Sequence, residues 1–263
     1  MDGTQTVNGS TIGTASYSPL QGWSNTKKYA FFAFYPMPNE NVTLVYLNPD
    51  GTTSPYTRGV PAIKYTNPNL DVTKMEDVMT ANYYTDLFWH SSNDGGNNIP
   101  SGEVNFTFDH KLSCFEVRVK ESSAAAINII DFRIALSGIL YEGIVIPLNG
   151  DDSELIKAQK ATHEIALPLT DNEKALGQEY KNLCDLLLIP QGDNISISLN
   201  VNYTRKYGNN DPVSFNFQTI EPLTTALVRG TKHLVQLDFG DKNVYVMQNN
   251  SGWTEKTVEH KFN

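Results

Sequence analysis

The side chains best suited to acid–base chemistry in this sequence are its five histidines, because imidazole changes charge near neutral pH. They are spread singly along the chain: His90, His110, His163, His233 and His260. A general base needs a positioned partner beside a cleft, and a metal site needs several ligands at suitable spacing. His110, between Asp109 and Lys111, is the best acid–base candidate, but its neighbours supply neither requirement. We expect structural histidines and no catalytic residue.

Acidic residues in turn-like segments offer a second possible chemistry, the binding of a cation. Asp94 and the pair Asp151 and Asp152 lie in such segments, but their spacing differs from that of an EF-hand. The sequence also contains no G-x-S-x-G, H-E-x-x-H, Walker or G-x-G-x-x-G motif. We therefore expect solvated turn carboxylates, no bound metal, no cofactor and no enzymatic activity.

The two cysteines, Cys114 and Cys184, each lie inside a strand-like run of residues. Two cysteines do not make a disulfide framework, and neither belongs to a C-x-x-C pair. Cysteines in strands commonly pack as small hydrophobic side chains. We favour two free buried thiols, and a single disulfide is the alternative.

The composition limits the partners of the protein. Its 263 residues are 40% hydrophobic and 11% aromatic, which is ample material for packed cores. The net charge of −9 repels nucleic-acid backbones and anionic membrane surfaces. No apolar run approaches the ~20 residues that a membrane-spanning helix needs, so no transmembrane segment is expected. Residues 1–18 have neither the basic nor the apolar region of a signal peptide, so we expect no export signal within them.

Alternation of apolar and polar residues predicts the elements of the fold. It is clearest from Ile195 to Thr204, where Ile, Leu, Val and Tyr alternate with Ser, Asn and Thr, as in a half-buried antiparallel strand. Turn formers such as Asn48-Pro49-Asp50-Gly51 separate these runs. The expected strands cover residues 29–35, 42–47, 60–65, 85–90, 104–108, 115–119, 127–136, 140–147, 163–169, 184–190, 195–203, 213–217, 233–239 and 244–248.

At most one short helix is expected among these strands. Thr170 and Glu173 have the spacing of a capping box before residues 174–180, although Gly177 weakens the helix. Strands without a series of intervening helices indicate an all-β sandwich fold and not an α/β fold. The small-residue stretch at 121–126 predicts a boundary between two β-sandwich domains, residues 1–122 and 123–263.

Several segments, in order along the chain, resemble the fimbrillin-like (type V pilin) family of Bacteroidetes. In the first half these are residues 29–36, residues 75–81 and the Phe-x-His-x-Leu-Ser strand entry from Phe108 to Ser113. In the second half they are residues 186–191, which contain an Ile-Pro-Gln strand exit, residues 228–237, and Gly252 with Trp253. The likeness covers nearly the whole chain.

The resemblance implies two transthyretin-like Greek-key β-sandwich domains, lipoprotein export, and display in a fimbria at the cell surface, on the outer membrane. It implies that the partners are other fimbrial subunits, joined by addition of a β-strand, together with a host or microbial surface receptor. In the family, proteolytic removal of an N-terminal strand after a basic residue opens the groove for that strand. The first arginine here is Arg58, so this cleavage is not carried over to the chain.

The C-terminal segment is the candidate donor strand for assembly. Val258, His260 and Phe262 alternate with polar residues after Trp253, a pattern that suits entry into an apolar groove. The alternative is an ordinary last strand, paired in the sheet of its own chain.

A secreted glycan-binding β-sandwich module is the alternative function, because exposed aromatic rings can stack on sugars. The candidate rings are Trp23, Trp89, Trp253, Tyr83 and Tyr84. Large aromatic side chains dominate sandwich cores, so core packing is the favoured interpretation of these residues. A hydrolase ranks third, since it would need two facing carboxylates roughly 5 to 10 Å apart.

Overall fold

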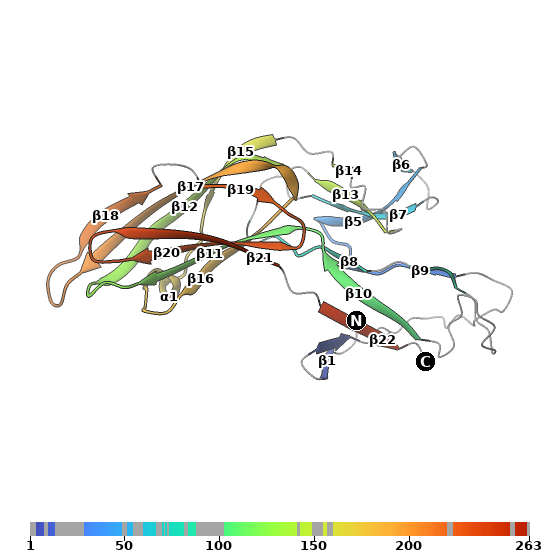
Figure 1. Cartoon of the computed structure of the whole chain (residues 1–263), viewed down its shortest axis with the longest axis horizontal. Coiled ribbons are helices and arrows are strands. Elements are labelled where there is room, and N and C mark those ends of the chain that lie inside the picture. The colour runs from blue at the N-terminus through green and yellow to red at the C-terminus, as the bar shows by residue number, and fades with distance from the viewer. Residues whose placement is uncertain are drawn as a thin grey trace.

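The computed structural model describes residues 4–7, 10–13, 29–48, 52–54, 60–66, 70, 72, 74–81, 84–87, 103–140, 143–148, 155–156, 160–219, 223–252 and 256–261. These residues are almost entirely β-strand, which confirms the all-β prediction, and α1 (Asp171–Lys174) is the single helix among them. Figure 1 shows an elongated molecule with two groups of sheets, one at each end. Strands from the second half of the chain dominate one group, and strands from the first half dominate the other.

Two sheets with a common core form the larger sandwich, at the left of Figure 1. In the first sheet the neighbouring strands are, in order, β15 (Lys160–Ala166), β12 (Ala126–Leu140), β17 (Gln191–Lys206) and β18 (Val213–Gln218), and β19 (Leu223–Leu227) also pairs with β17. In the second they are β16 (Lys181–Leu188), β11 (Ser113–Glu121), β20 (Thr231–Phe239) and β21 (Val244–Gly252). Across the core, Tyr203 of β17 meets Phe239 of β20 edge to face, with ring centroids 4.9 Å apart.

The long strands of this sandwich follow the alternation that predicts them. Ile195, Ile197, Leu199 and Val201 of β17 are all fully buried, whereas the residues between them are partly exposed. Each such side chain contributes roughly 1.5–3 kcal/mol by leaving water. Burial of one face of β17 therefore fixes its register against β12, because a shift by one residue would expose the whole apolar row.

A bulge in β12 explains the glutamine of the Ile-Pro-Gln exit. The register of β12 against β15 shifts between Ser137 and Ile139, and Gly138 between them has a φ of 79°. The Gln191 amide donates to the Gly138 carbonyl oxygen at 2.8 Å, and its Oε1 accepts from the Leu140 N–H at 2.9 Å. Gln191 thus provides partners for backbone groups at the point where the bulge interrupts the ladder.

The second group of sheets lies at the right of Figure 1. Its five-stranded sheet contains, in order, β14 (Leu155–Ile156), β13 (Ile144–Pro147), β7 (Val60–Tyr65), β5 (Val42–Leu47) and β6 (Thr53–Ser54). Its four-stranded sheet contains β22 (Lys256–Lys261), β10 (Glu103–His110), β8 (Met79–Ala81) and β4 (Phe34–Tyr35). Two pairs complete it: β3 (Tyr29–Phe31) with β9 (Tyr84–Leu87), and β1 (Thr4–Val7) with β2 (Ser10–Gly13). Ile63, Tyr65, Leu112 and Ile144 are at the centre of its core.

Both groups of sheets draw strands from either side of residue 122. β11, which precedes that residue, pairs antiparallel with β16 and parallel with β20 in the larger sandwich. β13, which follows it, pairs with β7 in the second group. The division into domains 1–122 and 123–263 stays a prediction, and strand pairing crosses that boundary in both directions.

The Phe-x-His-x-Leu-Ser segment lies where the chain passes from β10 to β11. His110 Nδ1 lies 2.9 Å from each carboxylate oxygen of Asp77. Leu112 is fully buried in the second core, and its carbonyl oxygen accepts from the Gly230 N–H at 3.0 Å. This motif therefore positions the connection between the two groups of sheets.

The predicted capping box is present, but the helix after it is shorter than expected. The Thr170 N–H donates to Glu173 Oε2 at 2.6 Å. The helix α1 ends at Lys174, and Ala175 is already extended, with a ψ of 122°. Ala175 instead forms a β-bridge with Asn128 of β12, so a contact with the sheet ends the helix after one turn.

Most predicted strands are confirmed, and 42–47 and 60–65 have the predicted bounds. Two were placed too far towards the C-terminus: 163–169 is β15, which ends at Ala166, and 184–190 is β16, which ends at Leu188. Each ends two residues before a proline, Pro168 or Pro190. Proline has no N–H for the ladder and restricts the residue before it, which accounts for both ends.

Gly143 permits the close approach of β13 to β7, and it provides a test of this packing. A Cβ at position 143 would lie 2.6 Å from the Tyr65 carbonyl oxygen. We expect Gly143→Ala to lower the free energy of unfolding by about 1–3 kcal/mol, because backbone must shift to accept the methyl group. Gly177→Ala is the matched control, since a Cβ there meets nothing within 4 Å. Equal losses in urea denaturation of the two variants would contradict the close-approach explanation.

Candidate assembly site

β10 is the strand that borders the C-terminal segment, and residues 106–108 show the predicted alternation. Phe106 and Phe108 are buried, with exposed fractions of 4% and 6%, whereas Thr107 between them is exposed. One face of β10 therefore belongs to a core and the other faces solvent. On one side β10 pairs with β8, through residues 108–110.

The other side of β10 pairs antiparallel with β22, the last strand of the chain. The register places Val258 opposite Phe106 and His260 opposite Val104. Position 258 thus shares a sheet face with a buried phenylalanine, as directly paired positions of antiparallel strands do. The other two predicted donor residues, Trp253 and Phe262, lie outside the described residues.

The chain changes sheets between its last two strands. β21 pairs with β20 in the larger sandwich, and β22, which begins only four positions after Gly252, pairs with β10 in the second group. β22 is the edge strand of its sheet, and β2 of the β1–β2 hairpin lies beside it (Figure 1). Within one molecule, β22 is therefore a last strand paired in its own chain, as the alternative interpretation expected.

His110 is buried at the end of β10 and has an acidic partner. Its side chain is 3% exposed and is paired with Asp77, which lies in the segment before β8. The pair joins that segment to the end of β10. No group of three or more His, Cys, Asp or Glu side chains in the described part of the chain could hold a metal ion.

The cysteines are free in the structure, as predicted. Cys114 is buried on β11, and Cys184 is half-buried on the neighbouring strand β16. Burial raises the pKa of each thiol to about 12, with a smaller contribution from the nearby Asp185 carboxylate. Both therefore remain protonated at neutral pH and are poor nucleophiles.

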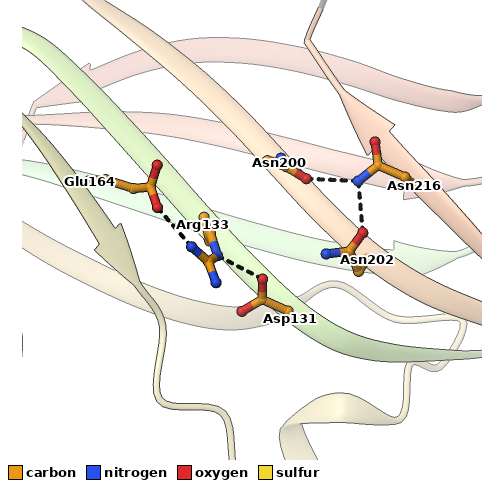
Figure 2. Close-up of polar contacts among 6 residues, drawn as sticks. All are labelled: Asp131, Arg133, Glu164, Asn200, Asn202 and Asn216. Carbon is orange, nitrogen blue, oxygen red and sulfur yellow. Dashed lines mark hydrogen bonds and ion pairs between the residues drawn. The ribbon is translucent and has the colours of Figure 1, made fainter.

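The exposed face of the β15-β12-β17-β18 sheet carries polar groups that satisfy one another (Figure 2). Asn216 Nδ2 donates to the Oδ1 atoms of Asn200 and Asn202, each at 2.8 Å. Arg133 of β12 forms ion pairs with its neighbours Asp131, at 2.8 Å, and Glu164, at 2.9 Å. This amide and ion-pair ladder is not a strip of exposed rings of the kind that stacks on sugars.

The aromatic candidates for glycan binding do not form a site in the described part of the chain. Trp23, Trp89, Trp253 and Tyr83 lie outside the described residues, and Tyr84 begins β9. In the described residues no helix has the length and apolar character needed to cross a membrane.

His233 is a buried histidine of the larger sandwich, and it makes the stability of the protein depend on pH. Its Nδ1 lies 3.1 Å from both Asn250 Oδ1 and Thr225 Oγ1, while Nε2 is buried without a hydrogen-bond partner. Burial lowers the pKa of His233 below 6.5, and the hydrogen bond with Asn250 opposes this only in part. A proton added to the buried ring would have no acceptor.

We expect the free energy of unfolding to fall as the pH drops from 7.5 to 5. Below about pH 6.5 the unfolded chain takes up a proton at residue 233 that the native chain resists, so acid favours the unfolded state. The slope from this residue is at most about 1.4 kcal/mol per pH unit. Urea titrations at several pH values should show a smaller slope for His233→Gln than for the wild type. Identical slopes would contradict the assignment.

The alternation of residues 258–262 predicts a candidate donor strand, but the sequence does not predict that this strand pairs with β10. The signal was present, since the alternation at Val104, Phe106 and Phe108 was used to predict a strand. What it lacked was the pairing partner, because β10 and β22 are separated by most of the chain. The sequence therefore predicts each of the two strands but not their pairing.

Packed, mostly antiparallel sheets with one minimal helix define the class of this chain: an all-β sandwich protein. The chain belongs to the fimbrillin-like family, whose model matches residues 2–253. This confirms the resemblance inferred from its motifs.

A solved structure shows the same fold. A fimbrial protein from Bacteroides vulgatus is 18% identical, with a TM-score of 0.55, over 95% of this chain and 84% of that chain. A protein from Bacteroides ovatus that is assigned to cell adhesion is 17% identical, with a TM-score of 0.46, over 94% of this chain and 76% of that chain. No curated protein matches the sequence.

Proposed function

We propose that this protein is a non-enzymatic structural and adhesive subunit of a cell-surface fimbria, and that subunits join by β-strand addition at the β10 edge. The observation that carries the proposal is the position of β22. This strand leaves the larger sandwich, crosses to the second group of sheets and completes an edge there. Family membership supports the fimbrial role.

Strand addition needs no contacts other than those that β10 and β22 already make within one chain. In the assembled form, β22 of one subunit lies on β10 of the next with the same register, Val258 opposite Phe106. Backbone hydrogen bonds along the pair supply affinity, and alternate side chains on the core face supply register. The same bonds form in both states, so the exchange replaces an intramolecular pair with an intermolecular one, as in domain swapping.

The balance between the two states depends on concentration and on the short connection before β22. The intramolecular pair benefits from a high effective concentration of its own strand. A short connection limits how freely β22 can adopt that arrangement, and strained short hinges favour exchange between molecules. We expect a monomer in dilute solution and assembly when subunits are concentrated at one place on the cell surface.

The proposed location is the cell surface, in a fimbria attached to the outer membrane, after export as a lipoprotein. The partners are other fimbrial subunits and a host or microbial surface receptor.

A disulfide that locks β22 onto its own β10 tests the proposal. Asn105 and Glu259 are directly paired, so cysteines at both positions can bridge. We expect the oxidised Asn105→Cys, Glu259→Cys chain to form no polymers at concentrations where the reduced form polymerises. The buried native thiols, with their pKa values raised to about 12, should not interfere. Assembly of the locked form at the wild-type level would contradict strand exchange at this edge, and each single variant serves as a control.

A further inference from the structure

One side wall of the larger sandwich is formed by two edge strands, β18 and β21. β18 is the last strand of the sheet order β15-β12-β17-β18, and β21 is the last strand of the order β16-β11-β20-β21. They lie on the same side, because β17 and β20, their inner neighbours, meet through Tyr203 and Phe239. Among the described strands, none pairs with the outer side of either one.

This wall lacks the features with which proteins usually protect a sheet edge. β18 (VSFNFQ) and β21 (VYVMQNNSG) contain no charged residue and no proline. The opposite wall, formed by β15 and β16, carries Lys160, Glu164, Lys181 and Asp185. Charges and prolines on an edge oppose the addition of another strand. The β18–β21 wall has neither and can accept a strand, whereas the charged residues of the β15–β16 wall oppose one.

Residues 244–247 make the first part of the β21 edge apolar on both faces. Tyr245 and Met247, on the outer face, are 56% and 45% exposed. Val244 and Val246, on the inner face, pack against the core and remain partly exposed. A strand added beside β21 would therefore gain apolar contacts on either face in addition to backbone hydrogen bonds.

We propose that the β21 edge binds a second copy of this chain, with the two β21 strands antiparallel about a two-fold axis. Two copies that each carry a net charge of −9 repel one another, so their contact must avoid charged surface, and this wall is uncharged. A two-fold contact uses the same strand twice, which closes the assembly. Centred near Val246, it places Tyr245 opposite the partner's Met247, a favourable sulfur–aromatic contact.

This lateral contact is separate from strand exchange at β10. It uses β21 of the larger sandwich, whereas the proposed exchange uses β22 and β10 of the second group of sheets. It would join subunits side by side, while strand exchange would join them in series. It does not require β22 to leave its own chain.

Sedimentation velocity of the chain with β22 locked by the disulfide between positions 105 and 259 tests the proposal, because the lock removes strand exchange. We expect a monomer–dimer equilibrium over the micromolar range, and at least a tenfold weaker dimer for Met247→Lys. Tyr245→Lys should weaken the dimer similarly, and both side chains are exposed enough for the folds to be retained. Ile130→Lys is the control, since Ile130 is 52% exposed on β12, and its dimer should be unchanged. A monomer at every concentration, or a dimer that withstands both β21 substitutions, would overturn the proposal. So would equal loss of the dimer in Ile130→Lys.

Discussion

A chain that lacks residues 253–263 should be unable to donate a strand to another subunit, while its larger sandwich stays folded. The deletion takes away β22 but none of the strands of that sandwich, which ends with β21 at Gly252. It also exposes the β10 edge, so the truncated chain should still accept a strand from an intact subunit. We expect no homopolymer from the truncated chain, and capping of growing polymers when it is mixed with the wild type.

Light scattering and electron microscopy measure both effects of the truncation. Wild-type chain should form polymers, the truncated chain alone should not, and their mixture should give shorter polymers. A circular dichroism melt establishes that the truncated chain is folded. Polymers of normal length from the truncated chain would show that the segment donates nothing.

Phe106→Ala should have the opposite defect: it damages the proposed acceptor strand β10 and leaves the donor strand β22 intact. Phe106 is 4% exposed and lies opposite Val258, so its loss leaves a void on the core face of the β10–β22 pair. Truncation of a buried phenylalanine to alanine commonly costs about 3–5 kcal/mol. We expect this loss in urea denaturation, together with earlier exposure of β22 to proteolysis.

Thr107→Ala is the matched control for Phe106→Ala, because Thr107 is adjacent on β10 but exposed. Its stability should lie within about 0.5 kcal/mol of the wild type. The Phe106→Ala chain should still donate its own β22 to the truncated chain, so strand addition in a mixture of the two should stop after one donor–acceptor pair. Long polymers from that mixture would contradict the division into one donor and one acceptor strand.

Local patterns of the sequence predicted most of the strands, because burial of one face imposes a period of two. β17 shows this well, since a row of fully buried residues, Ile195 to Val201, alternates with polar ones. The helix is shorter than predicted for a tertiary reason: the capping box forms, but Ala175 pairs with Asn128 of β12 and ends α1. Propensity within a few residues cannot include such a contact.

Pairing over long separations could not be predicted from alternation. β11 lies beside β20 in parallel, and β13 joins β7, although neither pair is close in the sequence. The pairing of β10 with β22 was missed for the same reason. Two motifs of the sequence have structural roles that their residue types alone did not predict. Gln191 of the Ile-Pro-Gln motif hydrogen-bonds at the Gly138 bulge, and His110 of the Phe-x-His-x-Leu-Ser motif joins β10 to Asp77.

Strand exchange at β10 and lateral contact at β21 both depend on edge strands. A sheet edge offers unpaired backbone groups, and a protein either covers that edge or uses it. In this chain β22 covers the β10 edge in a way that a second subunit can repeat, while the uncharged β21 edge has no covering strand among the described residues. The chain therefore has one edge suited to growth in series and one suited to lateral contact.

A disulfide trap between two different chains tests directly whether β22 of one subunit adds to β10 of another. One chain lacks residues 253–263 and carries Asn105→Cys, and the other is complete and carries Glu259→Cys, so the two new cysteines can meet only between molecules. Strand addition predicts a disulfide-linked heterodimer, identified by its mass after mild oxidation, and none when the second cysteine is placed at Ser137 on the exposed face of β12. A heterodimer no more abundant than in that control would contradict strand addition at the β10 edge.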